Sequence, residues 1–371
     1  VYQGLLFMDQ WLIQSRSRFG MVDYQIIILI FAVLMMGGFL PAVLMAALIT
    51  LLMFVRQYSR LRVIHHNTDA TTLHSRIERP LRHKKALEKY GDRVRIVRLK
   101  GSLFLGTAHT LLEELKTMLQ PPCVFMILDF SRVNGTDAST ANALLRLHQA
   151  CVQKKVILIL TSLPHELKAL LKSSGLAILD NSDDEAMLTT RGLMQTVGLF
   201  NSWDSALEWC ENELLGRLPT NESGEYTLES VLKERLDLLP YEVVHLVRYF
   251  ESVEAKAGET FIQQGDKADA LYLITKGKVD IQLEQDEGKR QRLKTMMPGT
   301  IIGEISLYTG GFRTASATAV EDTQLMRLTA KSLSDMESHN QLMAVRLHRF
   351  VVMLLTQRLT DSNKVLEELF D

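Results

Sequence analysis

A glutamate and an arginine nine residues apart, Glu304 and Arg313, are the side chains of this 371-residue chain best suited to hold a small anionic ligand. A carboxylate accepts hydrogen bonds from hydroxyl groups, and a guanidinium grips a phosphate through two parallel N–H bonds. Glycines such as Gly303 let the backbone approach closely, so that free amides of a turn form a small anion-binding nest. A ribose hydroxyl and a ring phosphate need partners of this kind, so the pattern favours a cyclic nucleotide as the ligand.

The elements expected to position these residues are the short strands of a β-roll. From residue 257 onward, apolar and polar residues alternate with a period of two, which is typical of half-buried strands. We expect a short apolar strand directly after Glu304 and flanking helices at residues 227–252 and 333–370. The alternative interpretation is that Gly, Glu and Arg at this spacing only shape a corner of the roll.

Three stretches of this region resemble the cyclic-nucleotide-binding domain: residues 258–266 (GETFIQQGD), 270–283 (ALYLITKGKVDIQL) and 299–319 (GTIIGEISLYTGGFRTASATA). The resemblance implies a jelly-roll fold in which a C-terminal helix moves over the bound nucleotide. It implies that Glu304 holds the ribose and Arg313 the phosphate, and the residues alongside them are Gly303, Ile305, Ser306 and Thr314. Thr314 is found in both cAMP and cGMP binders, so either nucleotide is expected.

The middle of the chain, residues 92–215, predicts an α/β layer domain because strand-like and helix-like segments alternate along it. Near-continuous apolar runs at 124–130 and 156–163 are typical of strands buried on both faces. Residues 128–149 (LDFSRVNGTDASTANALLRLHQ) resemble the STAS domain, the module shared by anti-sigma-factor antagonists and the cytoplasmic tails of SulP anion transporters.

Asp137 and Ser139 stand at the start of the helix that follows the first of these strands. In the antagonists a serine at this place is phosphorylated, and a helix N-terminus suits a phosphate. Ser and Asp are also the ordinary residues of a helix cap. Ser139 is therefore either a phospho-acceptor or part of a cap with Asp137, and the cap is the preferred interpretation.

The N-terminal part predicts membrane segments. Residues 24–55 carry no charge, and as one straight helix they would measure about 48 Å, well beyond a hydrocarbon core of about 30 Å. Residues 37–41 (GGFLP) divide this run, which leaves either a kinked, tilted span or a hairpin of two short helices. Between residues 56 and 100 there are 13 Lys or Arg against 4 Asp or Glu. By the positive-inside rule, we expect the chain after about residue 56 to be cytoplasmic.

The totals exclude several classes of function. A formal charge of −1 argues against a nucleic-acid-binding protein. Three cysteines without paired spacing indicate reduced core thiols, and the sequence contains no CxxC motif or Cys/His cluster that predicts a metal site. We find no GxSxG, P-loop or acid pair with a histidine, so we expect no catalytic residues, no cofactor and no enzyme.

The predicted order is membrane helices (residues 1–58), a basic cytoplasmic linker (59–91), a STAS-like domain (92–215), a linker (216–226) and a cyclic-nucleotide-binding-like domain (227–371). This order resembles the C-terminal portion of a SulP, or sulfate permease, family anion transporter. The resemblance implies an integral protein of the inner or plasma membrane, whose partners are the bilayer, an N-terminal transport core, an inorganic anion such as sulfate, a cyclic nucleotide and a second copy in a homodimer. The alternative is a membrane-tethered signalling or scaffold protein whose STAS-like domain binds a protein partner and that transports nothing.

Overall fold

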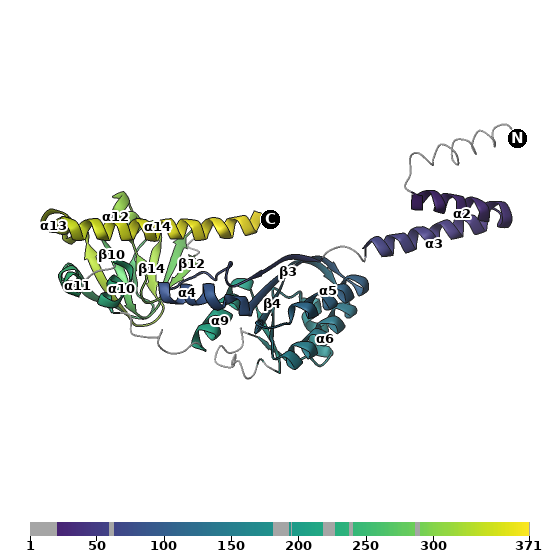
Figure 1. Cartoon of the computed structure of the whole chain (residues 1–371), viewed down its shortest axis with the longest axis horizontal. Coiled ribbons are helices and arrows are strands. Elements are labelled where there is room, and N and C mark those ends of the chain that lie inside the picture. Colours follow the sequence, from purple (N-terminus) through teal and green to yellow (C-terminus); the bar gives the residue numbers. More distant parts are fainter. Residues whose placement is uncertain are drawn as a thin grey trace, which may run out of the picture.

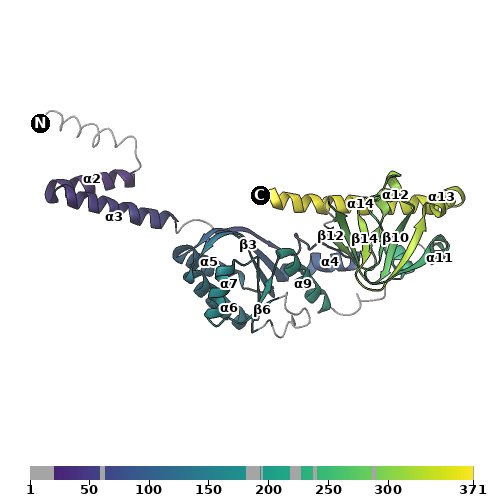
Figure 2. The ribbon, with the colours of Figure 1, turned by 180° about the vertical axis from the view of Figure 1, so that it is seen from behind.

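The computed structural model describes residues 21–58, 63–180, 193, 195–217, 227–236, 240–285 and 290–370. In chain order they form a helical hairpin, an α/β domain and a β-roll domain, which Figures 1 and 2 show from opposite sides. Most of the predicted linker 216–226 and the first twenty residues of the predicted membrane part lie outside the described residues.

The hairpin consists of α2 (Met21–Gly37) and α3 (Phe39–Tyr58), which lie side by side in both views. Gly38 separates them with a φ of 86°, in the left-handed region that glycine adopts most readily. The predicted transmembrane hairpin is not confirmed, since no helix among the described residues is both long and apolar enough to cross a bilayer.

The α/β domain is built on one six-stranded sheet with the order β1-β3-β4-β5-β7-β6. Its strands are β1 (Ile64–Asp69), β3 (Val94–Leu103), β4 (Phe125–Thr136), β5 (Ile157–Thr161), β6 (Ile178–Asp180) and β7 (Val197–Phe200). The edge strand β1 is antiparallel to β3, and the remaining neighbours are parallel. This sheet confirms the α/β layer domain expected from the alternating pattern.

The two faces of this sheet carry separate cores, because successive residues of a strand point to opposite sides. Met126 and Leu128 pack under α5 (Leu105–Met118), α6 (Ala138–Lys154) and α7 (His165–Ser173). Phe125 and Ile127 pack under α4 (Leu81–Tyr90) and α9 (Trp203–Gly216). Both cores are mainly apolar, and buried polar side chains such as Asp129 and Thr161 lie at the last paired residues of β4 and β5. Burial on both faces explains why these strands read as nearly continuous hydrophobic runs.

Residues 59–91, expected to be a basic linker, carry regular structure where the chain is described. They include β1, the two-residue strand β2 (Ile77–Glu78) and α4, followed by the short 3₁₀ helix η3 (Gly91–Arg93). The sequence of β1 is IHHNTD, which shows no apolar alternation, so hydrophobic patterning could not predict it. Strand β1 belongs to the sheet of the α/β domain and β2 to a sheet of the C-terminal domain, so this segment contributes a strand to each domain.

The C-terminal domain is a jelly roll made of two facing sheets, as expected. One has the order β13-β10-β15-β8 and the other β2-β12-β11-β14-β9. The strands are β8 (Glu251–Ala255), β9 (Thr260–Ile262), β10 (Ala270–Lys276), β11 (Val279–Glu284), β12 (Arg290–Met296), β13 (Ile301–Ile302), β14 (Ser316–Ala319) and β15 (Thr323–Thr329). The flanking helices are α10 (Leu228–Leu236), α11 (Pro240–Val247), α13 (Ala330–His339) and α14 (Gln341–Phe370).

The strand predicted after Glu304 is wrong, because residues 304–309 form the short helix α12 (Glu304–Thr309). Gly303 precedes it and Gly310 follows it, both in the left-handed conformation. Such residues start and stop a helix within a few positions, and a short apolar run between them does not distinguish helix from strand.

Helix α14 closes the domain. Its buried face packs against the sheet and the other helices through Met343, Ala344, Leu347, Phe350, Val351 and Leu354. The helix then continues past the roll, toward the side on which α4 lies (Figure 1). Its last turns therefore lie near the joint between the two domains.

We expect Gly91→Ala to destabilise the α/β domain by about 2 kcal/mol or more. A Cβ at Gly91 would lie 2.5 Å from the backbone carbonyl of Ala70, which side-chain motion cannot relieve. Gly216→Ala is the control, because no heavy atom lies within 4 Å of its added Cβ. Urea unfolding followed by tryptophan fluorescence measures both variants, and equal midpoints would contradict this packing.

Candidate functional site

A cavity of about 350 Å³ in the jelly roll brings together all six residues that the sequence singled out for nucleotide binding. Gly303, Glu304, Ile305 and Ser306 come from the start of α12, and Arg313 and Thr314 come from the segment before β14. The walls between them are mainly apolar and include Ile262, Ile281, Met296, Ile302 and Ala317. The cavity therefore combines an apolar enclosure with one buried carboxylate and one buried guanidinium. Their role in binding remains a prediction.

Arg313 is held in place before any ligand binds. Its side chain is nearly buried, and its Nη1 donates to the carbonyl oxygen of Gly303 at 3.0 Å. Its Nη2 donates to the carbonyl oxygen of Ala270 at 2.7 Å and to Oδ1 of Asp269 at 3.1 Å. Asp269 in turn accepts a hydrogen bond from Arg327 on β15. A guanidinium fixed by two carbonyls and a carboxylate loses little freedom when it meets an anion.

Arg313 can take this position only because residue 303 is a glycine without a side chain. Its φ is 82°, and a Cβ built there would lie 2.6 Å from Nη1 of Arg313. The absence of a side chain thus lets the arginine reach the carbonyl of the same residue.

Glu304 is buried, with 2% of its surface exposed, and its partner comes from α14. Nη1 of Arg358 donates to Oε1 of Glu304, and Nη2 of Arg358 donates to the carbonyl oxygen of Ile301 at 2.8 Å. The predicted ribose acceptor and phosphate binder therefore do not contact each other. Each has its own counter-charge, and both face the same cavity.

Sequence reasoning missed Asp269 and Arg358, although both hold the predicted residues in place. Asp269 lies 44 residues before Arg313, and Arg358 lies 54 residues after Glu304. Only the fold brings them together, so no local spacing could have found them.

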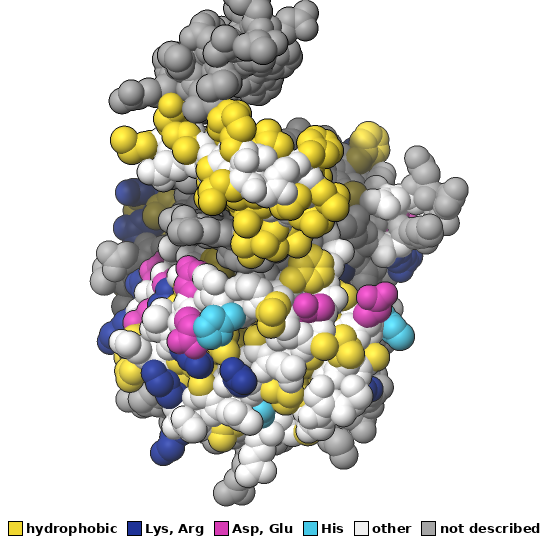
Figure 3. Space-filling model, turned by 90° about the vertical axis from the view of Figure 1, so that its right-hand side faces the viewer, with side chains coloured by type: hydrophobic (Ala, Val, Ile, Leu, Met, Phe, Trp, Pro, Cys, Tyr) yellow, Lys and Arg dark blue, Asp and Glu magenta, His cyan; other side chains and the backbone are white. Residues whose placement is uncertain are grey.

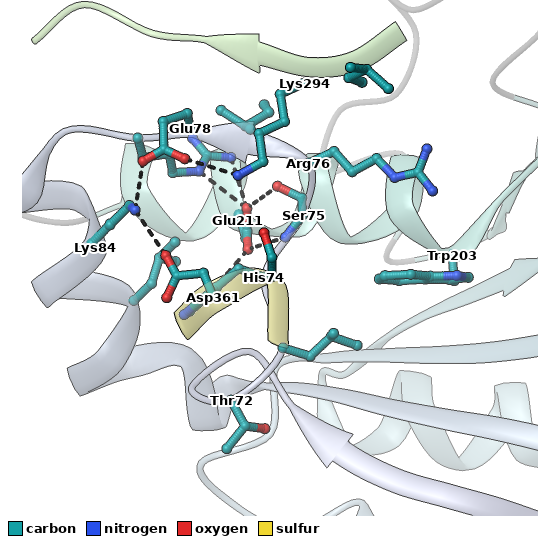
Figure 4. A pocket seen from close by; sticks show the side chains of 16 residues that line it. Thr72, His74, Ser75, Arg76, Glu78, Lys84, Trp203, Glu211, Lys294 and Asp361 are labelled. Atoms are coloured by element: carbon teal, nitrogen blue, oxygen red, sulfur yellow. Dashed lines mark hydrogen bonds and ion pairs between the residues drawn. The ribbon is translucent and has the colours of Figure 1, made fainter. Parts of the chain in front are cut away.

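A second cavity, of about 420 Å³, lies between the α/β domain and the jelly roll (Figure 4). Nζ of Lys84 on α4 donates to Glu78 at 2.7 Å and to Asp361 of α14 at 3.3 Å. Lys294 on β12 donates to the other oxygen of Glu78 at 3.3 Å.

On the α/β side of this cavity, the buried Glu211 accepts hydrogen bonds from Ser75 and Arg79. Charges from both domains thus line one interface.

The pKa of Glu78 reflects this setting. Burial raises the pKa, but the positive charges of Arg358, Lys84 and Lys294 outweigh burial and lower it to about 2, from the usual 4.5. Glu78 is therefore ionised at neutral pH and holds the joint through cations from three elements.

Asp137 is the N-cap of α6, and its side chain accepts from the backbone N–H of Thr140 at 3.0 Å. The hydroxyl of Ser139 donates to the same carboxylate. Burial raises the pKa of Asp137, but the hydrogen bonds from Ser139 and Thr140 outweigh burial and lower it. Phosphorylation of Ser139 would therefore place a second anion against an ionised cap residue.

Comparison with known families agrees with both domains. The STAS domain family matches residues 86–185, and the cyclic nucleotide-binding domain family matches residues 252–340. A STAS domain and a cyclic nucleotide-binding domain are therefore both present in this chain, and both are regulatory modules.

Three relatives match different lengths of this chain. The cyclic AMP receptor protein of Thermus thermophilus is 41% identical over 91 residues, 24% of this chain and 42% of that protein. Glutaminase 2 of Bradyrhizobium diazoefficiens is 25% identical over 318 residues, 82% of this chain and 47% of that protein. The vacuolar basic amino acid transporter VSB1 of Saccharomyces cerevisiae is 24% identical over 214 residues, 55% of this chain and 19% of that protein. The chain spans less than half the length of each of these relatives.

We expect Gly303→Ala to destabilise the jelly roll more than Gly310→Ala does. Both glycines have a positive φ, so both variants strain the backbone, but only Gly303→Ala also forces Arg313 away. The added clash should lower the free energy of unfolding by about 1–3 kcal/mol. Thermal unfolding measures this loss as a lower midpoint for Gly303→Ala than for Gly310→Ala. Equal losses in both variants would show that Arg313 does not depend on the missing side chain.

We also expect Glu78→Gln to destabilise the folded chain by about 2 kcal/mol at pH 7, since one unit of pKa shift corresponds to about 1.4 kcal/mol and part of the shift is screened. A carboxylate whose pKa is lowered on folding stabilises above its unfolded pKa and loses this contribution as the pH falls. The gap between the native chain and the variant should therefore narrow between pH 4.5 and 2, the interval between the two pKa values.

Urea unfolding at pH 7, 4.5 and 3.5 measures this gap. Glu113→Gln removes an exposed carboxylate that is paired with Lys116, and it serves as the control with a small effect. If the difference in free energy of unfolding between the native chain and Glu78→Gln is the same at all three pH values, Glu78 is not held ionised by its neighbours.

Proposed function

We propose that the C-terminal domain binds a cyclic nucleotide, cAMP or cGMP, and that this binding regulates the protein. One observation carries the proposal: a buried carboxylate and a buried, fixed guanidinium face one cavity of about 350 Å³. In this cavity Arg313 binds the ring phosphate, Glu304 accepts from the ribose, and the apolar walls enclose the base. The similarity to a protein named for binding cyclic AMP supports the same ligand class.

The regulated activity that we propose is secondary transport of an anion. The chain then represents the last membrane segments and the cytoplasmic regulatory part of a transporter that resembles the SulP family. The similarity to a protein named as a vacuolar basic amino acid transporter, which extends over 55% of this chain, supports transport as the regulated activity. The anion as substrate rests on the resemblance of the domain order to the SulP family.

The surface of the hairpin supports a membrane or transport-core partner. Figure 3 shows hydrophobic side chains gathered over this end of the molecule. On α2 and α3, Met36, Phe39, Leu40 and Leu44 each expose more than 60% of their surface. Exposed apolar area of this kind is usually covered by lipid or by other protein segments. The proposal therefore places the hairpin against a bilayer and a transport core, with the two folded domains on the cytoplasmic side.

The second candidate is a regulatory scaffold without transport. The relative named glutaminase 2 matches 82% of this chain, although its name denotes a different activity from that of the transporter relative. A region shared by proteins that are named for two different activities is expected to regulate them rather than to bind the substrate of either. Anion flux in membranes that contain the whole protein separates the candidates, because only the transporter predicts flux that changes with nucleotide.

We expect calorimetric titration of the chain in detergent to show saturable binding of cAMP or cGMP. Arg313→Lys keeps the charge opposite Asp269 but removes the two-pronged grip on phosphate, so its affinity should fall by about 10-fold or more. Arg290→Lys is the control, because Arg290 pairs with Glu284 on the surface of the roll. Circular dichroism checks that each variant is folded. No heat with either nucleotide, or equal affinity in Arg313→Lys, would overturn the proposal.

A further inference from the structure

One turn of α14 reaches both cavities of the molecule. Arg358 and Ser362 line the nucleotide cavity, while Asp361 and Ser362 line the cavity between the domains. Lys294 of β12 also lines both cavities. The ligand site and the domain joint therefore share a wall, and a movement of this turn changes both.

Arg358 occupies the carboxylate that the proposed nucleotide needs. It donates to Glu304 and to the carbonyl of Ile301, and its side chain is 17% exposed. Arg358 gives Glu304 an opposite charge as well as a hydrogen bond, and the attraction between the two charges adds to that bond. A ribose hydroxyl is neutral, so it competes poorly for Glu304 while Arg358 stays in place.

Asp361, three residues further along the helix, binds the other domain. Its Oδ2 accepts from Nζ of Lys84 at 3.3 Å, as Figure 4 shows. Lys84 belongs to α4, whose Leu87 packs in the same core as Leu207 and Leu214 of α9. The turn that covers Glu304 is thus attached to an element of the STAS domain.

Glu78 connects these two contacts. It accepts from Lys84 and Lys294, and the charge of Arg358 also stabilises its ionised form. Its strand β2 pairs in parallel with β12, through hydrogen bonds from the Thr295 N–H to the carbonyl of Arg76 and from the Met297 N–H to the carbonyl of Glu78, both 3.1 Å. A shift of Arg358 therefore changes the charges that hold β2 on the roll.

We propose that α14 is an autoinhibitory strap, in which Arg358 blocks the ribose-binding carboxylate while Asp361 ties the same turn to Lys84. Nucleotide binding and docking of the two domains then oppose each other. By reciprocity, a nucleotide that displaces Arg358 loosens the joint, and a looser joint binds nucleotide more tightly. This inference rests on the proposed nucleotide site and adds how that site is regulated.

Three single variants of the full chain test the strap by titration with cAMP and cGMP. Asp361→Asn and Lys84→Met remove the tie, and neither residue lines the nucleotide cavity. We expect Asp361→Asn to bind about 2- to 5-fold more tightly, the effect of losing one partly exposed ion pair. Lys84→Met should bind more tightly by at least as much, because it also loses the contact with Glu78. The signs are informative, because a general charge effect on an anionic ligand would strengthen binding in Asp361→Asn and weaken it in Lys84→Met. Arg358→Gln removes the competing cation and should also bind more tightly.

Hydrogen exchange of the native chain gives an independent readout. On addition of saturating cAMP or cGMP, we expect faster exchange at the amides of Thr295 and Met297, which pair with the β2 segment. Asp335→Asn, an equal change of charge on the exposed surface of α13, is the control and should change neither affinity nor exchange.

Each outcome decides between the proposals. No binding by the native chain or by any variant overturns the nucleotide site and the strap together. Binding with unchanged affinity in Asp361→Asn and Lys84→Met and unchanged exchange overturns the strap alone. If the affinity rises in Asp361→Asn and falls in Lys84→Met, or if Asp335→Asn changes the affinity as much as they do, the effect is one of overall charge on an anionic ligand. Either result overturns the strap. Weaker binding by Arg358→Gln shows that Arg358 contacts the ligand, which also overturns it.

Discussion

The contact between Glu304 and Arg358 is the interaction on which the position of the last turns of α14 over the ligand cavity depends. A carboxylate that is 2% exposed is costly to bury unless a cation and further hydrogen bonds accompany it. The cation is supplied by α14, a helix whose earlier turns are already fixed by the apolar core of the domain. The helix is therefore held at one end by packing and at the other by a charge inside the ligand cavity.

The same requirement extends to the joint between the domains. Glu78 is nearly buried and ionised, and its cations come from α4, β12 and α14. Arg292 of β12 adds a contact to Glu208 of α9 at 3.5 Å. The Lys84–Asp361 and Arg292–Glu208 pairs are partly exposed, so each of these two contributes little on its own. An interface of this kind can open and close at modest cost, which suits a regulatory joint.

The parts of the fold that the sequence predicted are those with a strong periodic signal. The runs at β4 and β5 indicated a sheet buried on both faces, and the alternation from residue 257 indicated the roll. The six cavity residues were found because they are close in sequence and match a known motif. Strand β1 has no apolar alternation, and β2 has only two residues, so neither was visible.

The partners of the site were hidden for a different reason. Arg358 and Lys84 act through contacts that span 54 and 277 residues, and in the sequence each looks like an ordinary charged residue on a helix surface. Helix α12 was misassigned because two glycines with positive φ confine it to six residues. Backbone conformation and long-range charge pairing, rather than composition, therefore determine how this site is organised.

A crystal structure of the chain with bound cAMP or cGMP tests the central claim most directly. The account predicts the phosphate on Arg313, a ribose hydroxyl within hydrogen-bond distance of Glu304, and Arg358 withdrawn from that carboxylate, with Asp361 separated from Lys84. A nucleotide bound elsewhere, or one bound in this cavity while Arg358 still contacts Glu304 and Asp361 still contacts Lys84, would contradict it.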